Sequence, residues 1–252
     1  MKHYRSFLFS EACLDGESIQ LDDRESHHLT RVLRVRAGAP IEVLDGKGTR
    51  YIGTIESVQA KGVRVAVTSV QSTPVPRPRI VLLQAESKTK SMDLVLRMAT
   101  EIGVSAIQPV FTDQGEHVHR KWNKRRLVMI EACKQCGLSY VPELYEPCSL
   151  RDWLRANAYS EDDNLRLVAS LRPGSRPLWT LLERVRSGLV EVVIAVGPAG
   201  DFSTAEYRLL CEHGFTEVRL GSNVLRVETA VAYILGVVDQ VIRGSGVGHS
   251  MT

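Results

Sequence analysis

The chain has 252 residues, of which 44% are hydrophobic and 24% charged, and its formal net charge is +3. These values exclude a fibrous repeat and wholesale disorder, and the length allows two modest domains. The N-terminus carries no sustained apolar stretch, and no window approaches the roughly 20 apolar residues of a membrane-spanning helix. We therefore expect a soluble, cytoplasmic protein of two domains.

The cysteines indicate a reducing compartment, because five is an odd number and their spacing gives no disulfide framework. Cys133 and Cys136 form a C-x-x-C pair inside a predicted helix over Leu127–Gly137, and no second pair lies at zinc-finger spacing. Metal or redox use is the alternative to a simpler interpretation as two small helix residues. We expect no metal.

Basic residues gather in two clusters. Four arginines and two histidines lie between Arg24 and Arg36, interrupted only by Glu25, and a second cluster runs from His119 to Arg126 around Trp122. Arginine and lysine beside an aromatic ring suit a phosphate backbone and a stacked base. A solvated helix face explains the same charges equally well.

The first part of the chain predicts short β-strands, because apolar and polar residues alternate there. One helix is expected from about Glu25 to Arg34, with Leu29, Val32 and Leu33 as its apolar stripe. Together these elements predict a small β-barrel that carries one basic helix. The expected strands are Ser6–Phe9, Ser18–Leu21, Pro40–Leu44, Arg50–Val58 and Val63–Val70.

A Pro-rich stretch over residues 73–79 predicts an interdomain linker, because proline enters neither helix nor sheet interiors. We expect one domain over residues 1–72, a second over 80–245 and a flexible tail over 246–252. In the second domain apolar strands alternate with helices, which predicts an α/β fold with a mainly parallel sheet and a ligand at the carboxyl ends of its strands. The expected elements are Ile80–Ala85, Met92–Ile102, Ala106–Phe111, Lys124–Gly137, Arg166–Ser170, Leu178–Arg186, Val190–Val196, Thr204–His213, Glu217–Leu220 and Thr229–Arg243.

One turn in this domain is rich in glycine. The strand over Val192–Val196 leads into Gly197–Phe202, and Ser203 and Glu206 then have the spacing of a capping box at the start of a helix. Such a turn lets a ligand approach the backbone closely. It is not a G-x-G-x-x-G, and the chain has no P-loop, nucleophile elbow or H-E-x-x-H, so dinucleotide-binding, kinase, hydrolase and zincin functions lack their defining residues.

A second strand, turn and helix start spans Leu220–Ala230. Arg226 and Glu228 are the charged members of an otherwise apolar and small run, which is an unusual place for charge. Either Arg226 merely pairs with Glu228 or it takes part in chemistry.

At these two segments the chain resembles the RsmE family, the small-subunit rRNA uridine-N3 methyltransferases of the SPOUT superfamily, whose motifs are G-P-E-G-G-F-S and L-G-x-x-I-L-R-x-E-T-A. His28–Gly38, Lys90–Val104 and Glu131–Pro142 are similar to further motifs of the family. These motifs occur in the family's order and over nearly the full length. Their agreement is a stronger signal than any one motif.

The resemblance implies a PUA-like β-barrel, a SPOUT domain with a trefoil knot, a homodimer and the cofactor S-adenosylmethionine. It implies methylation of N3 of a uridine in the 16S rRNA of the small ribosomal subunit. The residues that would bind the cofactor are Ser170, Leu171, Gly197, Pro198, Ala199, Gly200, Asp201, Leu220, Ser222, Asn223, Val224 and Leu225. Those that would bind RNA are Arg5, His28, Arg31, Arg34, Arg120 and Lys121.

The reaction that the resemblance implies is an in-line attack of uracil N3 on the sulfonium methyl group. It requires removal of the imide proton and stabilisation of the developing oxyanion. We hypothesise that Arg226 supplies the positive charge and that Glu228 orients Arg226, with Glu101 as a more distant partner. No general base is evident. Compensation of the helix dipole, about 0.3–1 kcal/mol, would also explain Glu228 without catalysis.

The chain departs from the family at a few positions. Ala199 stands where the family has Glu, Asp201 where it has the second Gly, and Cys136–Leu138 replaces Ser-x-Arg. If the turn needs a positive φ at position 201, Asp tolerates it better than most residues. The altered turn leaves open a non-catalytic RNA-binding or ribosome-assembly protein with the same fold. A knotted methyltransferase with a tRNA target is the other alternative.

Overall fold

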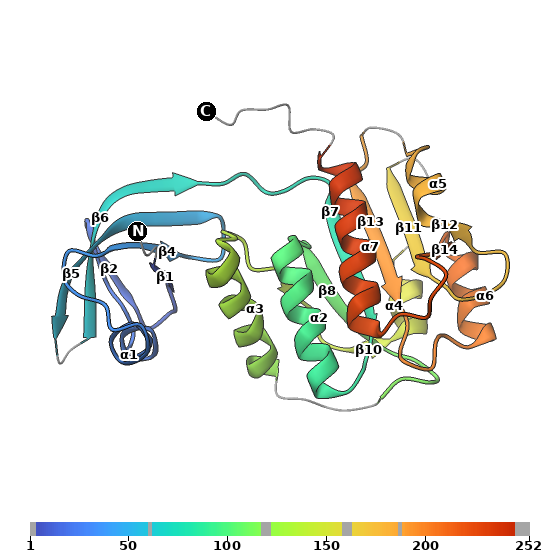
Figure 1. Ribbon diagram of the computed structural model, residues 1–252, viewed down its shortest axis with the longest axis horizontal. Helices are drawn as coiled ribbons and strands as arrows, with labels where there is room; N and C mark the ends of the chain where they lie inside the picture. Colours follow the sequence, from blue (N-terminus) through green and yellow to red (C-terminus); the bar gives the residue numbers. More distant parts are fainter. Residues whose placement is uncertain (1–3, 60–61, 117–121, 158–162, 186–187, 245–252) are drawn as a thin grey trace. The chain divides into compact units, whose positions relative to one another are not determined.

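The computed structural model describes residues 4–59, 62–116, 122–157, 163–185 and 188–244 (Figure 1). The chain divides into two compact units, Met1–Val75 with Ile130–Val141, and Pro76–Met129 with Pro142–Thr252. The division falls within the expected linker, and it assigns Ile130–Val141 to the first unit, which the expected boundaries did not. The expected tail, residues 246–252, lies outside the described residues.

The first unit contains a six-stranded sheet of order β1-β4-β5-β6-β3-β2. β1 pairs with β4 in parallel, and the other pairs are antiparallel. Ile19, Ile41, Ile55 and Val65 point into the core of this unit, which confirms the alternating pattern. β2 was not predicted, because its three residues are all exposed and give no alternation. The strands are β1 Tyr4–Phe7, β2 Cys13–Asp15, β3 Ser18–Gln20, β4 Pro40–Leu44, β5 Thr49–Gln59 and β6 Gly62–Ser72.

The expected helix over Glu25–Arg34 is two short elements, α1 (Asp23–His27) and a π-helical turn, η1 (His28–Val32). The Leu33 N–H reaches back to the His28 carbonyl over 3.1 Å, which is the wider spacing of a π-helix. Because the wider turn changes the helical register, Leu29 stays buried while Val32 is 62% exposed. The prediction that Val32 belongs to the apolar stripe was therefore wrong.

Glu25 is buried, although the sequence suggested an acid within a basic surface cluster. Its carboxylate accepts hydrogen bonds from Ser6 Oγ at 2.6 Å, Phe7 N at 3.1 Å and Lys134 Nζ at 2.8 Å. Lys134 comes from the C-terminal part of α3 (Trp122–Cys136), which the division assigns to this unit. Two buried charges are tolerated here because they pair with each other and are hydrogen-bonded.

The second unit is built on a parallel sheet of order β10-β8-β7-β13-β11-β14-β12, with β9 paired to β8. All its described pairs are parallel, which confirms the predicted α/β fold. The strands are β7 Arg79–Ala85, β8 Ala106–Phe111, β9 Glu143–Leu144, β10 Cys148–Ser149, β11 Asn164–Ala169, β12 Arg176–Pro177, β13 Glu191–Val196 and β14 Thr216–Arg219.

Helices cover both faces of this sheet. α4 (Leu150–Ala156) and α6 (Thr204–Glu212) share one core with alternate residues of the central strands, such as Val81 and Val193. Their neighbours Ile80 and Val192 are also buried and point to the opposite face. α2 (Thr89–Ile102), α7 (Val227–Ile242) and the short α5 (Leu178–Leu182) complete the unit, and α2 packs beside α7 (Figure 1).

Three neighbouring strands end at one edge of this sheet, β13 at Val196, β11 at Ala169 and β14 at Arg219. Because parallel strands end on the same side, the loops that follow them converge there. Among the described residues, no helix combines the length and apolar character needed to cross a membrane.

Candidate functional site

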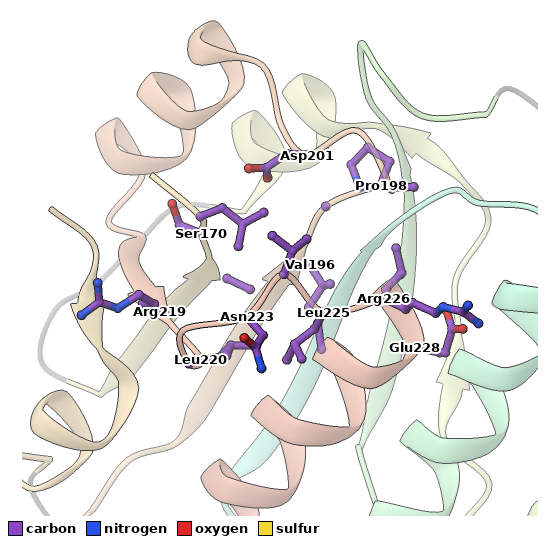
Figure 2. A pocket seen from close by; sticks show the side chains of 18 of the residues that line it. Ser170, Val196, Pro198, Asp201, Arg219, Leu220, Asn223, Leu225, Arg226 and Glu228 are labelled. Atoms are coloured by element: carbon purple, nitrogen blue, oxygen red, sulfur yellow. The ribbon is translucent and has the colours of Figure 1, made fainter. Parts of the chain in front are cut away.

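A cavity of about 440 Å³ lies at the carboxyl ends of β11, β13 and β14 (Figure 2). This volume is in the range of small-molecule sites, roughly 300–1,000 Å³. The loop after β13 supplies Pro198 and Asp201 to one side, and the segment after β14 supplies Leu220, Asn223 and Leu225 to another (Figure 2). The cavity therefore forms where the sequence predicted a ligand.

All the residues expected to bind a cofactor line this cavity except Gly200 and Ser222. Arg226 and Glu228 line it as well. Whether these residues bind a cofactor stays a prediction. The lining residues that the sequence did not suggest are Ser91, Ala169, Val196, Arg219, Gly221, Val227 and Ala230.

The turn after β13 places Asp201 in the left-handed region, with φ of 65°. The Asp201 N–H donates to the Pro198 carbonyl over 3.0 Å, and the Asp201 Oδ1 atom accepts from the Phe202 N–H over 2.8 Å. The position thus needs a positive φ, which Asp tolerates. The capping box between Ser203 and Glu206 is confirmed at the start of α6.

The loop after β11 is held by an acid on β14. The Ser170 hydroxyl donates to Glu217 over 2.8 Å and accepts from the Arg172 N–H over 3.1 Å. The Arg172 guanidinium forms an ion pair with Glu217 at 2.9 Å. These bonds fix the part of the loop in which Ser170 and Leu171 face the cavity.

Arg226 is the residue that precedes the first turn of α7, and its side chain is exposed. No described residue forms a hydrogen bond or an ion pair with its guanidinium. Arg226 interacts with Glu228 through its charge, without a hydrogen bond or an ion pair, so whether it only pairs with Glu228 or takes part in chemistry stays a prediction. A guanidinium that donates no hydrogen bond to a described residue can donate to a ligand in the cavity.

Glu228 accepts a hydrogen bond from the other helix at the cavity. The Ser91 hydroxyl donates to Glu228 Oε2 over 2.8 Å, and among the described residues no ion pair joins Glu228 to Arg226. The hydrogen bond from its own backbone N–H, the bond from Ser91 and the charge of Arg226 lower the pKa of Glu228. Glu101 lies ten residues along α2 from Ser91, about 15 Å of helix, and does not line the cavity. The hypothesis of Glu101 as a more distant partner stays a prediction.

The residues expected to bind RNA are in different situations. Arg31 and Arg34 are exposed and His28 is half-buried. The Arg5 guanidinium already donates to Glu42 at 2.8 Å and to the Gln135 carbonyl at 2.9 Å. Arg120 and Lys121 lie outside the described residues. RNA binding by this set stays a prediction.

Cys133 of the C-x-x-C pair is buried, and its thiol donates to the Tyr140 carbonyl. Burial, and to a smaller extent Cys136, raises the pKa of the Cys133 thiol to about 12. Because the thiolate is the form that binds metal and attacks disulfides, Cys133 is poorly suited to either use. In the part of the chain that the structure describes, no three or more His, Cys, Asp or Glu residues are grouped to hold a metal.

Similar proteins are known. The ribosomal RNA small subunit methyltransferase E of Rickettsia conorii is 26% identical over 91% of this chain and 92% of that protein. A putative methyltransferase from Legionella pneumophila, solved with bound S-adenosylmethionine, is 30% identical over 95% of this chain and 98% of that one, with a TM-score of 0.81. The Neisseria gonorrhoeae ribosomal RNA small subunit methyltransferase E, also bound to S-adenosylmethionine, is 26% identical over 96% and 98% of the two chains, again with a TM-score of 0.81.

A family model described as an RNA methyltransferase domain matches residues 73–239, more than half of the chain. Another, described as an RNA methyltransferase PUA domain, matches residues 21–68. The chain belongs to the RsmE family of RNA methyltransferases. Its PUA-like N-terminal β domain and C-terminal parallel-sheet methyltransferase domain are those of RsmE-family members, as the resemblance implied.

Sequence reasoning missed residues that the RsmE-family fold brings to the cavity. Two signals could have pointed to Ser91. It belongs to a segment that resembles the family, and it follows β7, which ends at the edge of the sheet where the cavity lies. Glu217 and Tyr207 carry no local signal. Glu217 acts on the cavity through Ser170, 47 residues away in the sequence, and Tyr207 acts through Asp201 in the loop just before α6.

Proposed function

We propose that this RsmE-family chain transfers a methyl group from S-adenosylmethionine to N3 of a uridine in the 16S rRNA of the small ribosomal subunit. One observation carries the proposal: a single cavity is lined by the three loops expected to bind the cofactor and by Arg226 and Glu228. The cofactor bound to the Legionella and Neisseria relatives supports it.

The residues present fit S-adenosylmethionine. Val196, Pro198 and Leu225 give apolar walls suited to a purine ring, while the loop backbone and Asn223 offer polar groups. A Cβ at Gly197 would come within 3.1 Å of the Phe202 ring, so a larger residue would crowd this wall. When bound, the cofactor supplies an electrophilic methyl group.

The proposed role of Arg226 follows from its positive charge and from the absence of a hydrogen bond between its guanidinium and the described residues. Loss of the N3 proton leaves negative charge on the oxygens of the uracil ring. A guanidinium without an internal partner can donate to such an oxygen, and this interaction grows as the charge develops. Arg226 therefore also favours loss of the imide proton.

The task of Glu228 is different from that of a general base. Its pKa is lowered, so it is ionised at neutral pH and a poor acceptor for the proton of a weakly acidic imide. Its negative charge sits at the start of α7, where it balances the helix dipole and the charge of Arg226. Glu228 keeps this corner of the cavity close to neutral while Arg226 remains free.

The RNA and dimer expectations belong to the same proposal. Exposed Arg31 and Arg34 support RNA binding by the first unit.

The homodimer is supported by apolar residues on α7. Tyr233, Val237 and Val241 follow one another at four-residue spacing along this helix, and Tyr233 is 48% exposed. This apolar stripe, which is exposed at Tyr233 and Val241 and half-buried at Val237, supports a homodimer through α7. Analytical ultracentrifugation should show that the wild-type protein is a dimer. Tyr233→Asp should dissociate this dimer, whereas the control Gln240→Asp should not. A monomeric wild-type protein would contradict a homodimer.

The decisive experiment is methyl transfer to unmodified small ribosomal subunits, with the product nucleosides identified by mass spectrometry. We expect 3-methyluridine in 16S rRNA with wild-type protein and a much lower rate of its formation with Arg226→Ala. A folded wild-type protein that binds RNA without methylating it would favour the non-catalytic alternative. Methylation of tRNA in place of the subunits would favour the tRNA enzyme.

A further inference from the structure

Tyr207 lies between two loops of the cavity without lining the cavity itself. The side chain is only 1% exposed. Its hydroxyl oxygen lies 2.7 Å from Asp201 Oδ1 and 3.2 Å from the Ala169 carbonyl oxygen. A phenol has one proton to donate, and the shorter contact, to a charged acceptor, is the stronger. Tyr207 therefore donates to Asp201.

The ring of Tyr207 is held on both sides. The Phe202 ring meets it edge to face, with centroids 5.6 Å apart and planes inclined by 79°. The Arg172 guanidinium lies over it, 5.1 Å from the centroid, and Arg172 is itself fixed by Glu217. The hydroxyl of Tyr207 thus has a defined position between the loops after β11 and β13.

The Tyr207 hydroxyl also stays a donor. Burial raises the pKa of Tyr207 well above its usual range; a hydrogen bond with Ser170 acts against this, and the neighbouring Asp201 carboxylate raises the pKa further. The proton is therefore present throughout the pH range of any ordinary assay. A permanently protonated phenol is suited to hold a carboxylate in one orientation.

Asp201 lines the cavity, as does Ser170, which also hydrogen-bonds the Tyr207 hydroxyl. The Asp201 Oδ1 atom receives two donors, the Tyr207 hydroxyl and the Phe202 N–H. Its Oδ2 atom has no donor among the described residues. The positive φ of Asp201 and the bond to Pro198 fix the backbone that carries it.

We propose that Tyr207 is a positioning residue of the cofactor site: it holds Asp201 so that Oδ2 accepts a hydrogen bond from an N–H or O–H group of the cofactor. This inference rests on the proposed function. S-adenosylmethionine and its demethylated product S-adenosylhomocysteine carry the same N–H and O–H groups and differ at sulfur. The contact therefore contributes equally to the binding of both.

The test is a comparison of dissociation constants for the two ligands by titration calorimetry. Tyr207→Phe keeps the ring and leaves Asp201 without its donor. Asp201→Asn must offer its one acceptor to Tyr207 and Phe202, which turns the amide N–H₂ toward the ligand. We expect each change to raise the dissociation constants of both ligands by about 10- to 50-fold. The double variant should bind no more weakly than the weaker-binding single variant. The kcat at saturating cofactor should stay within about twofold of wild type while KM for the cofactor rises.

A matched control is Tyr140→Phe, which removes a 2.8 Å phenol hydrogen bond to the Thr73 carbonyl in the other unit. Tyr140→Phe should leave both dissociation constants unchanged.

Wild-type affinity in Tyr207→Phe, or additive losses in the double variant, would overturn the inference and leave the proposed function standing. A loss confined to S-adenosylmethionine would overturn it too, because the contact would then be with the sulfonium charge. If Tyr207→Phe does not fold, Asp201→Asn with unchanged affinity for both ligands overturns it alone. Absence of binding by the wild-type protein would overturn the proposed function as well.

Discussion

The Ser91 hydroxyl and the Glu228 carboxylate join two helices at the cavity through a 2.8 Å hydrogen bond. Ser91 lies in the first turn of α2 and Glu228 in the first turn of α7. The positive ends of two helix dipoles therefore meet beside one carboxylate. Glu228 supplies the negative charge that this corner requires, and Arg226 needs no internal partner.

Replacing Arg226 with Ala should lower kcat by about 100- to 1,000-fold, the usual cost of removing one group that stabilises a developing oxyanion. The side chain is exposed and makes no bond to a described residue, so the free energy of unfolding should change by less than about 0.5 kcal/mol. Single-turnover methyl transfer and urea unfolding measure the two quantities. Arg151→Ala, on the exposed side of α4, is the control and should transfer methyl at the wild-type rate. A fully active Arg226→Ala variant would remove Arg226 from the mechanism.

Replacing Ser91 with Ala should reduce stability in a pH-dependent way. The lowered pKa of Glu228 means that its ionised form stabilises the fold at neutral pH, and that this contribution is lost as the pH falls below its usual value of 4.5. The variant should lose about 0.5 kcal/mol at pH 7, because the bond is partly exposed to solvent. The difference should shrink in acid. Denaturant unfolding at pH 7 and pH 3.5 tests this, and an equal loss at both values would show that Ser91 acts through packing alone.

Replacing Lys134 with Met should destabilise the protein by about 3–5 kcal/mol, since it leaves Glu25 charged and buried without its partner. Adding Glu25→Gln should recover a large part of this loss. The exposed pair of Arg24 and Glu131 is the matched comparison, and Arg24→Ala should cost less than about 1 kcal/mol. Urea unfolding of the three variants measures these values. Similar small losses for both pairs would mean that Glu25 reaches solvent.

Replacing Arg31 and Arg34 together with Ala should weaken binding to 16S rRNA and reduce its dependence on salt. For each arginine that binds a phosphate, its removal should lower the slope of log affinity against log salt concentration by about 1. Both side chains are exposed, so the fold should be unaffected. Filter binding from about 50 to 200 mM salt gives the slope. An unchanged slope would mean that Arg31 and Arg34 bind no phosphate of the RNA.

The second unit was largely predictable because its longer strands are continuous apolar runs and α6 begins with a capping box. β8 and the capping box of α6 were predicted residue by residue. α4 was missed, because Leu150–Ala156 is too short to give a clear helical period. The trefoil knot stays a prediction, since it depends on how the chain threads and not on any local pattern.

The loops that line the candidate site were predictable, but the residues that hold those loops in place were not. Gly197 and Leu225 belong to segments with family motifs, whereas Glu217 and Tyr207 act through contacts that no spacing reveals. The burial of Glu25 was missed for the same reason, because its partner lies 109 residues away in the sequence. Val32 was misplaced because a π-helical turn has no signature in apolar periodicity.

The assignment of Ile130–Val141 to the first unit affects how this protein can be dissected. A fragment that ends at Val75 has the whole β domain but lacks Lys134, so Glu25 would be left as an uncompensated buried charge. Arg50 would also lose the Gly137 carbonyl to which it donates over 2.7 Å. The first unit is therefore not a module that can be excised or transplanted as residues 1–75 alone; it needs residues 130–141 restored, through a short graft after Val75 or as a separate peptide.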